Sequence, residues 1–341
     1  MIRQRHPWTT SRRLRRLIAV LAAVALVGLA GWWIPTGDVV FAPGVTGDLA
    51  QMVHVAGGHK IRDGRLLMVA ITVIPADVWL YLWGRLDPND EVLPKQQVFP
   101  GMSLNQYVEF NASLMDQSQQ AAEVAGERLA GLPARAVAQP GVVVAGLLAR
   151  GTARGHLRVG DRVVAVAGHP VGPSNLYQVM SRFRAGDVVT FTIRRDGRTL
   201  AVPLSLTTIP GDPAPGVGIV VAPAVRYVVP RPVRIDSGDI GGPSAGLMFA
   251  LEIYQQITGK NLARGRTVVG TGEITPDGRV QPIGGVVQKV VTAYRAGAGV
   301  FLCPVANYPK AAAAVRARGW HLAVYPVATL AQAVRDLAPP S

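Results

Sequence analysis

A run of five small residues, Gly242-Pro243-Ser244-Ala245-Gly246, constrains this chain most, because an apolar stretch follows it directly. Glycine reaches backbone conformations that other residues avoid, so the run can turn sharply. The stretch from Ala245 to Ile257 has the length and polarity of a buried helix, and Thr258-Gly259 is a typical helix end. The sequence therefore predicts a serine at a helix N-terminus, where unpaired N–H groups can stabilise a developing oxyanion.

A second segment, from Thr271 to Lys289, follows the pattern T-G-E-I-T, then G-x-V-x-P-I-G-G-x-x-x-K. Its last residue lies 45 positions after Ser244 and is one of only five lysines, against thirty arginines. A lysine can lose its proton when it is desolvated, whereas an arginine stays charged. Valines surround Lys289 in the sequence, so we expect burial to lower its pKa and to let it act as a base toward a serine.

Both segments resemble the proteolytic domain of Lon proteases, which are Ser/Lys-dyad endopeptidases. The resemblance implies that Ser244 is the nucleophile and Lys289 the general base, and that Thr271 orients the lysine amine. Gly242 and Ala245 would support the serine turn. One departure concerns the acid that often stands three residues before the serine in this family. That position is Gly241 here, so no carboxylate role is carried over to it.

An alternative interpretation uses the same serine, because the run also fits the G-x-S-x-G turn of α/β-hydrolases. Glu273 or Asp277, followed by His321, would then complete an esterase triad in the expected order. Two features argue against it. A polar loop separates the strand-like Val233-Arg234-Ile235 from the serine turn, and His321 lies in the strand-like stretch Trp320 to Tyr325.

The composition excludes several classes of protein. The 341 residues are 49% hydrophobic, which is enough for two domains with real cores. The net charge is +14, but the first sixteen residues hold six arginines and no acid, and no basic run alternates with aromatic residues. We therefore expect no nucleic-acid partner. With a single cysteine, Cys303 in the strand-like Val300 to Cys303, the chain offers no zinc-type cluster, and we expect neither a metal nor a cofactor.

The basic tail, residues 1–16, precedes an uninterrupted apolar stretch, Leu17 to Ile34. Eighteen helical residues just span a bilayer core, and the preceding arginines favour a cytoplasmic N-terminus. We therefore predict a single transmembrane helix over residues 17–34 at the cell membrane, with the rest of the chain outside the cytoplasm. A signal peptide cleaved near Gly31 is the alternative.

Residues 137–207 are expected to form a separate domain, because prolines flank them on both sides. The stretch from Gly151 to Gly168 contains the pattern G-x-L-x-x-G-D-x-Φ-x-x-Φ-x-G and resembles bacterial protease-associated PDZ domains. PDZ domains bind an extended peptide at a sheet edge. The resemblance implies a carboxylate-binding loop and strand at Gly141, Val142 and Val143, and a facing helix with Leu176, Val179 and Met180. Simple core packing is the other explanation for these apolar residues.

Residues 50–130 contain strand-like runs at Leu66 to Ile74 and Val78 to Leu82, then a helical run from Asn105 to Leu129. The helical run resembles the helix before the active-site half of Lon proteolytic domains. We therefore predict an α+β multidomain fold in which a Lon-type proteolytic α/β domain, residues 50–130 and 216–338, carries an inserted β-rich PDZ domain. An independent N-terminal domain is the alternative.

The whole pattern resembles the membrane-anchored, PDZ-containing Lon-like serine proteases of bacteria. No G-x-x-x-x-G-K-[ST] run occurs in the sequence, so we expect an ATP-independent endopeptidase that cleaves unfolded or flexible protein substrates. A non-catalytic PDZ adaptor on a Lon-like scaffold is a second hypothesis, and an esterase using Ser244 and His321 is a third. Homo-oligomerisation is left open by the sequence.

Overall fold

The computed structural model describes residues 12–149, 151–209, 212 and 214–338, and it divides into two compact units. Unit 1 comprises the chain up to Ala42 together with Val73–Val98, and unit 2 comprises Pro43–Thr72 and the chain from Phe99 onward. Residues 1–11 of the predicted basic tail lie outside the described residues. Residues 73–98 belong to unit 1, although the sequence had placed them with the proteolytic domain.

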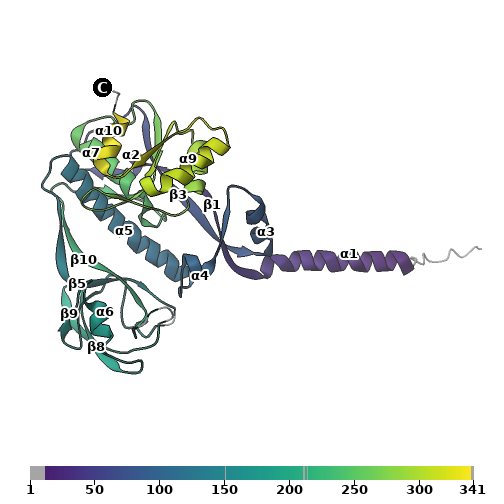
Figure 1. Ribbon diagram of the computed structural model, residues 1–341, viewed down its shortest axis with the longest axis horizontal. Helices are drawn as coiled ribbons and strands as arrows, with labels where there is room; N and C mark the ends of the chain where they lie inside the picture. Colours follow the sequence, from purple (N-terminus) through teal and green to yellow (C-terminus); the bar gives the residue numbers. More distant parts are fainter. Residues whose placement is uncertain (1–11, 150, 210–211, 213, 339–341) are drawn as a thin grey trace, which may run out of the picture. The chain divides into compact units, whose positions relative to one another are not determined.

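Unit 1 is built around a short antiparallel pair of strands. Residues Asp38–Phe41 of β1 pair with β4, and Gly84 lets helix α3 approach them closely. A Cβ on Gly84 would lie 3.1 Å from Val92 and 3.2 Å from Val40. The elements of this unit are α1 (Arg12–Ala30), η1 (Gly31–Trp33), α3 (Val78–Leu86), β4 (Glu91–Pro94) and α4 (Lys95–Val98), with parts of β1 (Pro35–Asp48) and β3 (Arg65–Asp77) (Figure 1).

The predicted strand at Val78 to Leu82 is wrong, because these residues begin helix α3. Asp77 caps this helix, since its side-chain Oδ1 accepts the backbone N–H of Leu80 at 2.8 Å. The apolar residues that suggested a strand are also spaced as one face of a helix.

The predicted transmembrane helix over Leu17 to Ile34 is not found. Helix α1 ends at Ala30, and a 3-10 turn and the extended Ile34 follow it. The apolar part of the helix, from Leu17 to Ala30, is about 21 Å long at 1.5 Å per residue, against about 30 Å for a hydrocarbon core. In the described part of the chain, no helix has both the length and the apolar character needed to cross a membrane.

The first sheet of unit 2 has the strand order β16-β15-β12-β3-β1. Strands β3, β12, β15 and β16 are parallel. Their side chains alternate between two cores: Leu66 and Met68 of β3 enter one, and Leu67 and Val69 enter the other. Such two-sided burial explains the unbroken apolar runs Leu66–Val69 of β3 and Val300–Cys303 of β15. The remaining strands of this sheet are β12 (Thr267–Gly270), β15 (Val300–Pro304) and β16 (Ala323–Val327).

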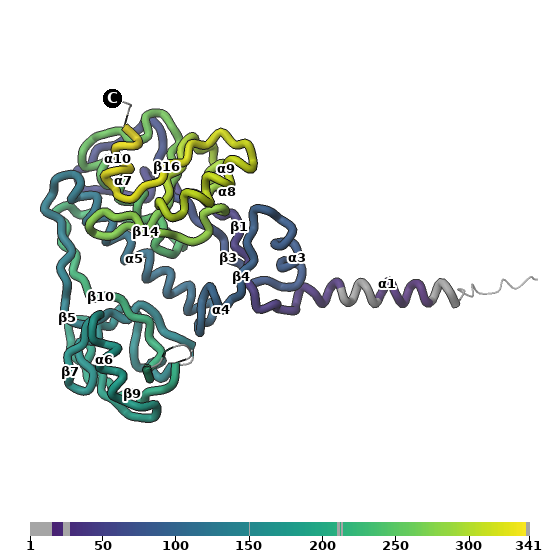
Figure 2. Tube along the Cα trace, in the orientation of Figure 1, coloured from purple at the N-terminus to yellow at the C-terminus, as the bar shows by residue number. Residues whose placement is uncertain are grey.

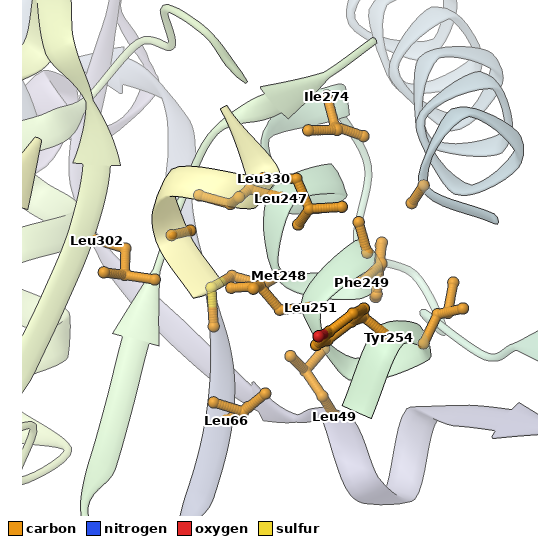
Figure 3. Close-up of a cluster of buried hydrophobic side chains, with 14 of the residues drawn as sticks. Leu49, Leu66, Leu247, Met248, Phe249, Leu251, Tyr254, Ile274, Leu302 and Leu330 are labelled. Carbon is orange, nitrogen blue, oxygen red and sulfur yellow. The ribbon is translucent and has the colours of Figure 1, made fainter. Parts of the chain in front are cut away.

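Helices cover both faces of this sheet. The first core includes side chains of α5 (Leu104–Leu129), α7 (Gly246–Thr258) and α10 (Leu330–Leu337), and Figure 3 shows Leu247 and Met248 of α7 in this cluster. The second core includes α8 (Val286–Arg295) and α9 (Tyr308–Ala317). Short elements complete this part: α2 (Leu49–Met52), β2 (Val53–Val55), β11 (Val233–Ile235), β13 (Glu273–Ile274), β14 (Val280–Gln281), η2 (Pro243–Ala245) and η3 (Val305–Asn307).

Two predicted helices are confirmed, and one of them ends at the glycine that the sequence indicated. Ser103 and Gln106 form a capping box at the start of α5, in which each side chain accepts a backbone N–H of the other residue. Helix α7 ends at Gly259, which adopts a left-handed conformation with φ 72°. The predicted strand ending at Cys303 is β15, in which Cys303 is fully buried.

Unit 2 also contains a second sheet with strand order β10-β5-β6-β8-β9, in the region that the sequence predicted as an inserted domain. Asp161 explains part of the sequence pattern: it is 2% exposed, accepts the N–H of Arg158 at 2.8 Å and pairs with Arg195 at 2.6 Å. Figures 1 and 2 show the long strands β5 and β10 of this second sheet. The elements are β5 (Arg135–Leu147), β6 (Arg162–Val166), β7 (His169–Pro170), α6 (Leu176–Met180), β8 (Val188–Arg195), β9 (Arg198–Ser205) and β10 (Ile219–Val228).

The core of this sheet extends beyond the predicted boundary at residue 207. Ala214 and Val217 are buried in it, and Ile219 packs against it. Strand β5 pairs with β10 from Arg135 opposite Val228 to Leu147 opposite Ile219, so the chain leaves and returns along one antiparallel pair. The observed architecture is an α+β mixture, as the sequence predicted.

Candidate active site

Helix α5 holds the turn that carries Ser244. Ser244 lies in the 3-10 turn η2, which leads directly into α7. Ser118 on α5 donates its Oγ–H to the carbonyl of Pro243 at 2.8 Å. The N–H of Gly242, which has φ 90°, donates to the carbonyl of Asn111 on the same helix at 2.8 Å. Two bonds to one helix therefore fix the backbone just before the serine.

Small residues at this turn are a packing requirement. A Cβ on Gly246 would lie 2.6 Å from Ser118 Oγ and 2.7 Å from Ile274 Cγ2. A Cβ on Gly241 would lie 3.0 Å from Asn111 Cβ, so a larger side chain there would push against α5. The glycine at position 241 is therefore explained by its contact with the helix.

The carbonyl of Ser244 is fixed by two donors from the following loop. It accepts the N–H of Gly272 at 2.8 Å and the hydroxyl of Thr271 at 3.0 Å. In the other direction, Leu247 donates its N–H to the carbonyl of Gly272 at 3.0 Å. The turn and the end of β12 are thereby joined by hydrogen bonds on both sides of the serine.

The structure brings Lys289 and Ser244 together. Lys289 Nζ lies 2.7 Å from Ser244 Oγ and 3.1 Å from Thr271 Oγ1, although 45 residues separate lysine and serine in the sequence. The lysine sits on α8 one turn after Gly285, and its side chain is 2% exposed. The predicted nucleophile, base and orienting threonine thus form one connected cluster.

Burial is the cause of the lysine's altered pKa. Desolvation lowers the pKa of Lys289 from 10.5 to about 7, because the buried site penalises the charged ammonium. Val286 and Val290 on the same helix are buried with it, as the sequence suggested. A substantial fraction of the lysine is therefore neutral at physiological pH, which is the form that can accept a proton.

The position of Thr271 determines how the amine is oriented. Thr271 has one hydroxyl proton, and its Oγ1 donates it to the Ser244 carbonyl. The lysine must therefore donate one of its own protons to Thr271 Oγ1. In the neutral amine, this arrangement leaves the nitrogen lone pair for the proton of the Ser244 hydroxyl. The two hydrogen bonds of Thr271 thereby fix the orientation of the Lys289 amine.

The esterase alternative gains no support from the geometry. His321 is exposed and lies before β16 instead of within it. Asp277 is engaged by Arg279 at 3.1 Å and by the hydroxyl of Thr275. Burial raises the pKa of the Glu273 carboxyl, so it disfavours the charged carboxylate that a triad acid needs. In the described residues, the side-chain partner of Ser244 Oγ is the lysine and not a histidine.

The expected peptide-binding strand is already paired on both edges. Val142 and Val143 lie opposite Val163 and Arg162 of β6 on one side, and they pair with β10 on the other. A Cβ on Gly141, which has φ 102°, would lie 2.4 Å from the carbonyl oxygen of Val163. This glycine therefore serves close strand packing, and the prediction that a peptide adds to β5 at these residues needs correction.

The facing helix was placed correctly but contributes to the core. Val179 and Met180 of α6 are 5% and 8% exposed and belong to the buried cluster of the second sheet, and Leu176 packs against that cluster. The packing explanation for these three residues is the one that the structure supports.

Asn111 and Ser118 are site residues that the sequence analysis missed. Both lie on α5, more than a hundred residues before the turn that they hold. Their helix had been recognised, but its polar residues gave no sign of a partner far along the chain. Within the described residues, no group of three or more His, Cys, Asp or Glu side chains is placed to bind a metal ion.

Comparison with known proteins places this cluster in a protease domain. Residues 233–337, which include Ser244, Thr271 and Lys289, match the Lon protease (S16) C-terminal proteolytic domain. Lon protease 2 of Herpetosiphon aurantiacus is 47% identical over 66 residues, which are 19% of this chain and 8% of that protein. Lon protease of Desulfosudis oleivorans is 38% identical over 77 residues, 22% of this chain and 9% of that protein. The chain thus spans under a tenth of these relatives' length, and the shared domain supports a serine peptidase.

Solved PDZ domains are similar to about a quarter of the chain. The PDZ domain of the SdrC-like protein from Listeria monocytogenes is 22% identical and covers 25% of this chain and 90% of its own, with a TM-score of 0.23. The corresponding domain from Listeria innocua is 23% identical and covers 24% of this chain and 92% of its own, also with a TM-score of 0.23.

Replacing Lys289 by Met should stabilise the fold, and the gain should depend on pH. The folded pKa of about 7 lies below the ordinary value of 10.5, so the folded state binds fewer protons than the unfolded state between these values. The stability of the unaltered protein therefore rises with pH across this window. We expect Lys289→Met to add on the order of a few kcal/mol to the free energy of unfolding at pH 7, and less toward pH 10.

Urea unfolding at pH 7, 8.5 and 10 measures this gain. Lys310→Met, which removes an exposed lysine, is the matched control and should show little change with pH. A gain for Lys289→Met that stays constant across the three pH values would contradict a buried, neutral lysine.

Proposed function

We propose that this protein is a serine endopeptidase that uses Ser244 as nucleophile and Lys289 as general base. The observation that carries the proposal is the 2.7 Å separation of Lys289 Nζ and Ser244 Oγ at a site where burial lowers the lysine pKa to about 7. A serine hydroxyl needs such a base, because it is a weak nucleophile on its own.

The proposed reaction begins when neutral Lys289 takes the hydroxyl proton while Ser244 Oγ attacks the peptide carbonyl carbon. The tetrahedral intermediate collapses to an acyl-enzyme as the lysine ammonium gives its proton to the departing amine. Water then attacks the ester with the lysine again as base, which releases the second product and restores the serine. Thr271 keeps the lysine amine oriented toward Ser244 through both steps.

The backbone around Ser244 restricts where an oxyanion can bind. Gly242, Gly246 and Leu247 already donate their N–H groups to the carbonyls of Asn111, Pro243 and Gly272. Pro243 has no N–H. On this turn, the N–H groups of Ser244 and Ala245 are therefore the candidates for oxyanion stabilisation at the start of α7.

We further propose that cleavage does not require ATP. The proposal rests on the sequence, which contains no G-x-x-x-x-G-K-[ST] phosphate-binding run. Substrates would then be unfolded or flexible polypeptides, which an enzyme can bind as extended chains without prior unfolding.

The second sheet would recruit such substrates at strand β10, not at β5. Strand β10 stands at one end of the strand order, and β5 is its neighbour there. A glycine-containing loop, Gly216–Gly218, precedes it. The carbonyls of Val217 and Gly218 fix this loop by accepting the N–H groups of Ala153 and Leu148. An extended peptide adds to an edge strand of this kind, and a preceding loop can hold its carboxylate.

Two features predicted from the sequence stay proposals. The location outside the cytoplasm is supported by the six arginines before Leu17 and by the long acidic or neutral stretch up to Lys60. Membrane association through the N-terminal region is supported by the same charge asymmetry.

Single substitutions of the dyad test the proposed chemistry. Ser244→Ala, Lys289→Ala and Lys289→Arg should each reduce hydrolysis of an unfolded protein by at least about a thousandfold, because residues that act as one unit fail together. The arginine variant should be no better than the alanine variant, since arginine cannot accept the serine proton. Substantial activity of Lys289→Arg would exclude the lysine as base, and Lys310→Arg is the matched control. A serine-reactive phosphonate should label the unaltered protein only, whereas a non-catalytic adaptor would not be labelled.

The pH dependence of hydrolysis should follow one deprotonation. We expect kcat/KM for a short peptide to rise about tenfold per pH unit below about pH 7 and to level off above it, because the neutral lysine is the active form. His321→Ala should keep the same profile. A profile that flattens or shifts in the His321 variant would favour the esterase triad instead.

Removal of the second sheet should separate recruitment from chemistry. Leu147 and Ile219 are paired, so an Asn-Gly turn can replace residues 148–218 and close β5 and β10 as a hairpin. Keeping β5 retains its packing on α5, where Gly146 lies near Phe110. We expect unchanged hydrolysis of a short peptide and a several-fold lower kcat/KM for an unfolded protein, because the hairpin keeps β10 but loses the Gly216–Gly218 loop and the strands that hold it. Equal loss on both substrates, or no loss on either, would contradict the recruitment role.

A further inference from the structure

Helix α3 in unit 1 exposes an apolar face. Its exposed large side chains stand at positions i, i+3, i+4 and i+7, which is one side of a helix. They are Trp79, Leu82, Trp83 and Leu86, with exposed fractions of 39%, 47%, 66% and 80%. A helix on a soluble core normally turns this face inward, so a face of this composition indicates an interaction surface.

The inward side of α3 is already occupied. Gly84 is buried and lies close to Val40 and Val92, so the helix is seated on the β1–β4 pair through its smallest residue. Asp77 caps the helix start through the N–H of Leu80. The orientation that exposes the tryptophans is therefore fixed by packing and capping.

The residues just before β1 continue this apolar surface. Trp79 Nε1 donates to the carbonyl of Gly28 at 2.7 Å, and a Cβ on Gly31 would lie 2.4 Å from the same nitrogen. This contact holds the end of α1 and the turn η1 against α3. Leu29, Trp32 and Trp33 are exposed there, at 64%, 65% and 87%. We define the aromatic surface as these three residues together with Trp79, Leu82, Trp83 and Leu86.

The chemistry of the aromatic surface favours lipid over protein. Tryptophan combines a large apolar ring with one polar N–H and is enriched where hydrocarbon meets headgroups. Arg85 is the one charged residue within α3, and its guanidinium lies over the Tyr81 ring at 5.9 Å. The surface is also continuous with α1, whose Leu17 and Leu21 are exposed and follow an arginine-rich segment. Apolar residues beside arginines are typical of segments that bind membrane surfaces.

The geometry points to the aromatic surface as a docking face that inserts into the interfacial layer of a phospholipid bilayer. The inference deepens the proposed membrane association of the N-terminal region and rests on it. It adds a second lipid contact, separate from α1 in the sequence, which fixes the orientation of unit 1 on the bilayer. It is independent of the serine and lysine chemistry.

Flotation with vesicles of phosphatidylethanolamine and phosphatidylglycerol tests this inference on the full chain. The test variant is Trp83→Gln with Leu86→Gln, which spares Trp79 because that residue also supports the fold. The matched control is Val108→Gln with Val188→Gln, two apolar residues of unit 2 that are 60% and 71% exposed. Peptide hydrolysis and circular dichroism of all forms confirm folding.

We expect the test variant to partition onto vesicles about tenfold or more weakly than the unaltered protein, because two large apolar side chains lose their burial in lipid. The control should bind as the unaltered protein does. Quenching of tryptophan fluorescence by lipids brominated in the upper acyl chain should also fall in the test variant.

Three outcomes would overturn the inference. Equal vesicle binding by the test variant and the unaltered protein would remove α3 as a lipid contact while leaving membrane association through α1 intact. Failure of the unaltered protein to bind any vesicle would remove both. A change from dimer to monomer in sedimentation velocity, with vesicle binding unaffected, would assign the surface to a second copy of the chain.

Discussion

The proposed chemistry of this protein depends on one buried lysine amine, whose pKa desolvation lowers to about 7. Lys289 is 2% exposed, and desolvation is the cause of its lowered pKa. The low pKa is therefore a property of the packing of α8 against the sheet more than of any one neighbour. If that packing loosened, water would reach the amine and the charged form would return. The activity of such a site is coupled to the integrity of its core.

A second constraint is that the hydrogen bonds that hold the serine turn come from a helix far away in the sequence. Ser118 and Pro243 are 125 residues apart, and an entire sheet lies between them in the sequence. A long flexible insertion would raise the entropic cost of bringing α5 to the turn, although that cost grows only slowly with length. The β5–β10 pair, which runs from Arg135 opposite Val228 to Leu147 opposite Ile219, brings the two ends of the insertion together. The inserted sheet can therefore be present without loosening the active site.

The sequence predicted best those features that local chemistry determines. Ser244 and Lys289 stand in runs whose glycines and valines indicate a turn and a buried helix, whereas the role of Thr271 followed from the resemblance to Lon proteolytic domains. The structure places the three side chains together. Long-range contacts escaped prediction: nothing near Asn111 indicates that its carbonyl accepts from Gly242. Strand pairing escaped as well, because the run of three valines at Val142–Val144 indicates a strand but not that both its edges are occupied. The apolar residues of α3 fit both a strand and one face of a helix, so their spacing alone did not distinguish the two. The side chain of Asp77, which caps the helix, is the signal that favours the helix.

A lysine base has a further consequence for the catalytic cycle. In the Ser-His-Asp arrangement, a carboxylate stabilises the imidazolium that forms when the base takes the proton. In the described part of this site, the partners of Lys289 Nζ are the hydroxyls of Ser244 and Thr271, and no carboxylate contributes to its pKa shift. In the proposed cycle, the transient ammonium is therefore left with Thr271 Oγ1 and the oxyanion of the intermediate as its stabilising partners. Such an ammonium is a strong proton donor toward the departing amine, so the burial that prepares the base also favours the collapse of the intermediate to products.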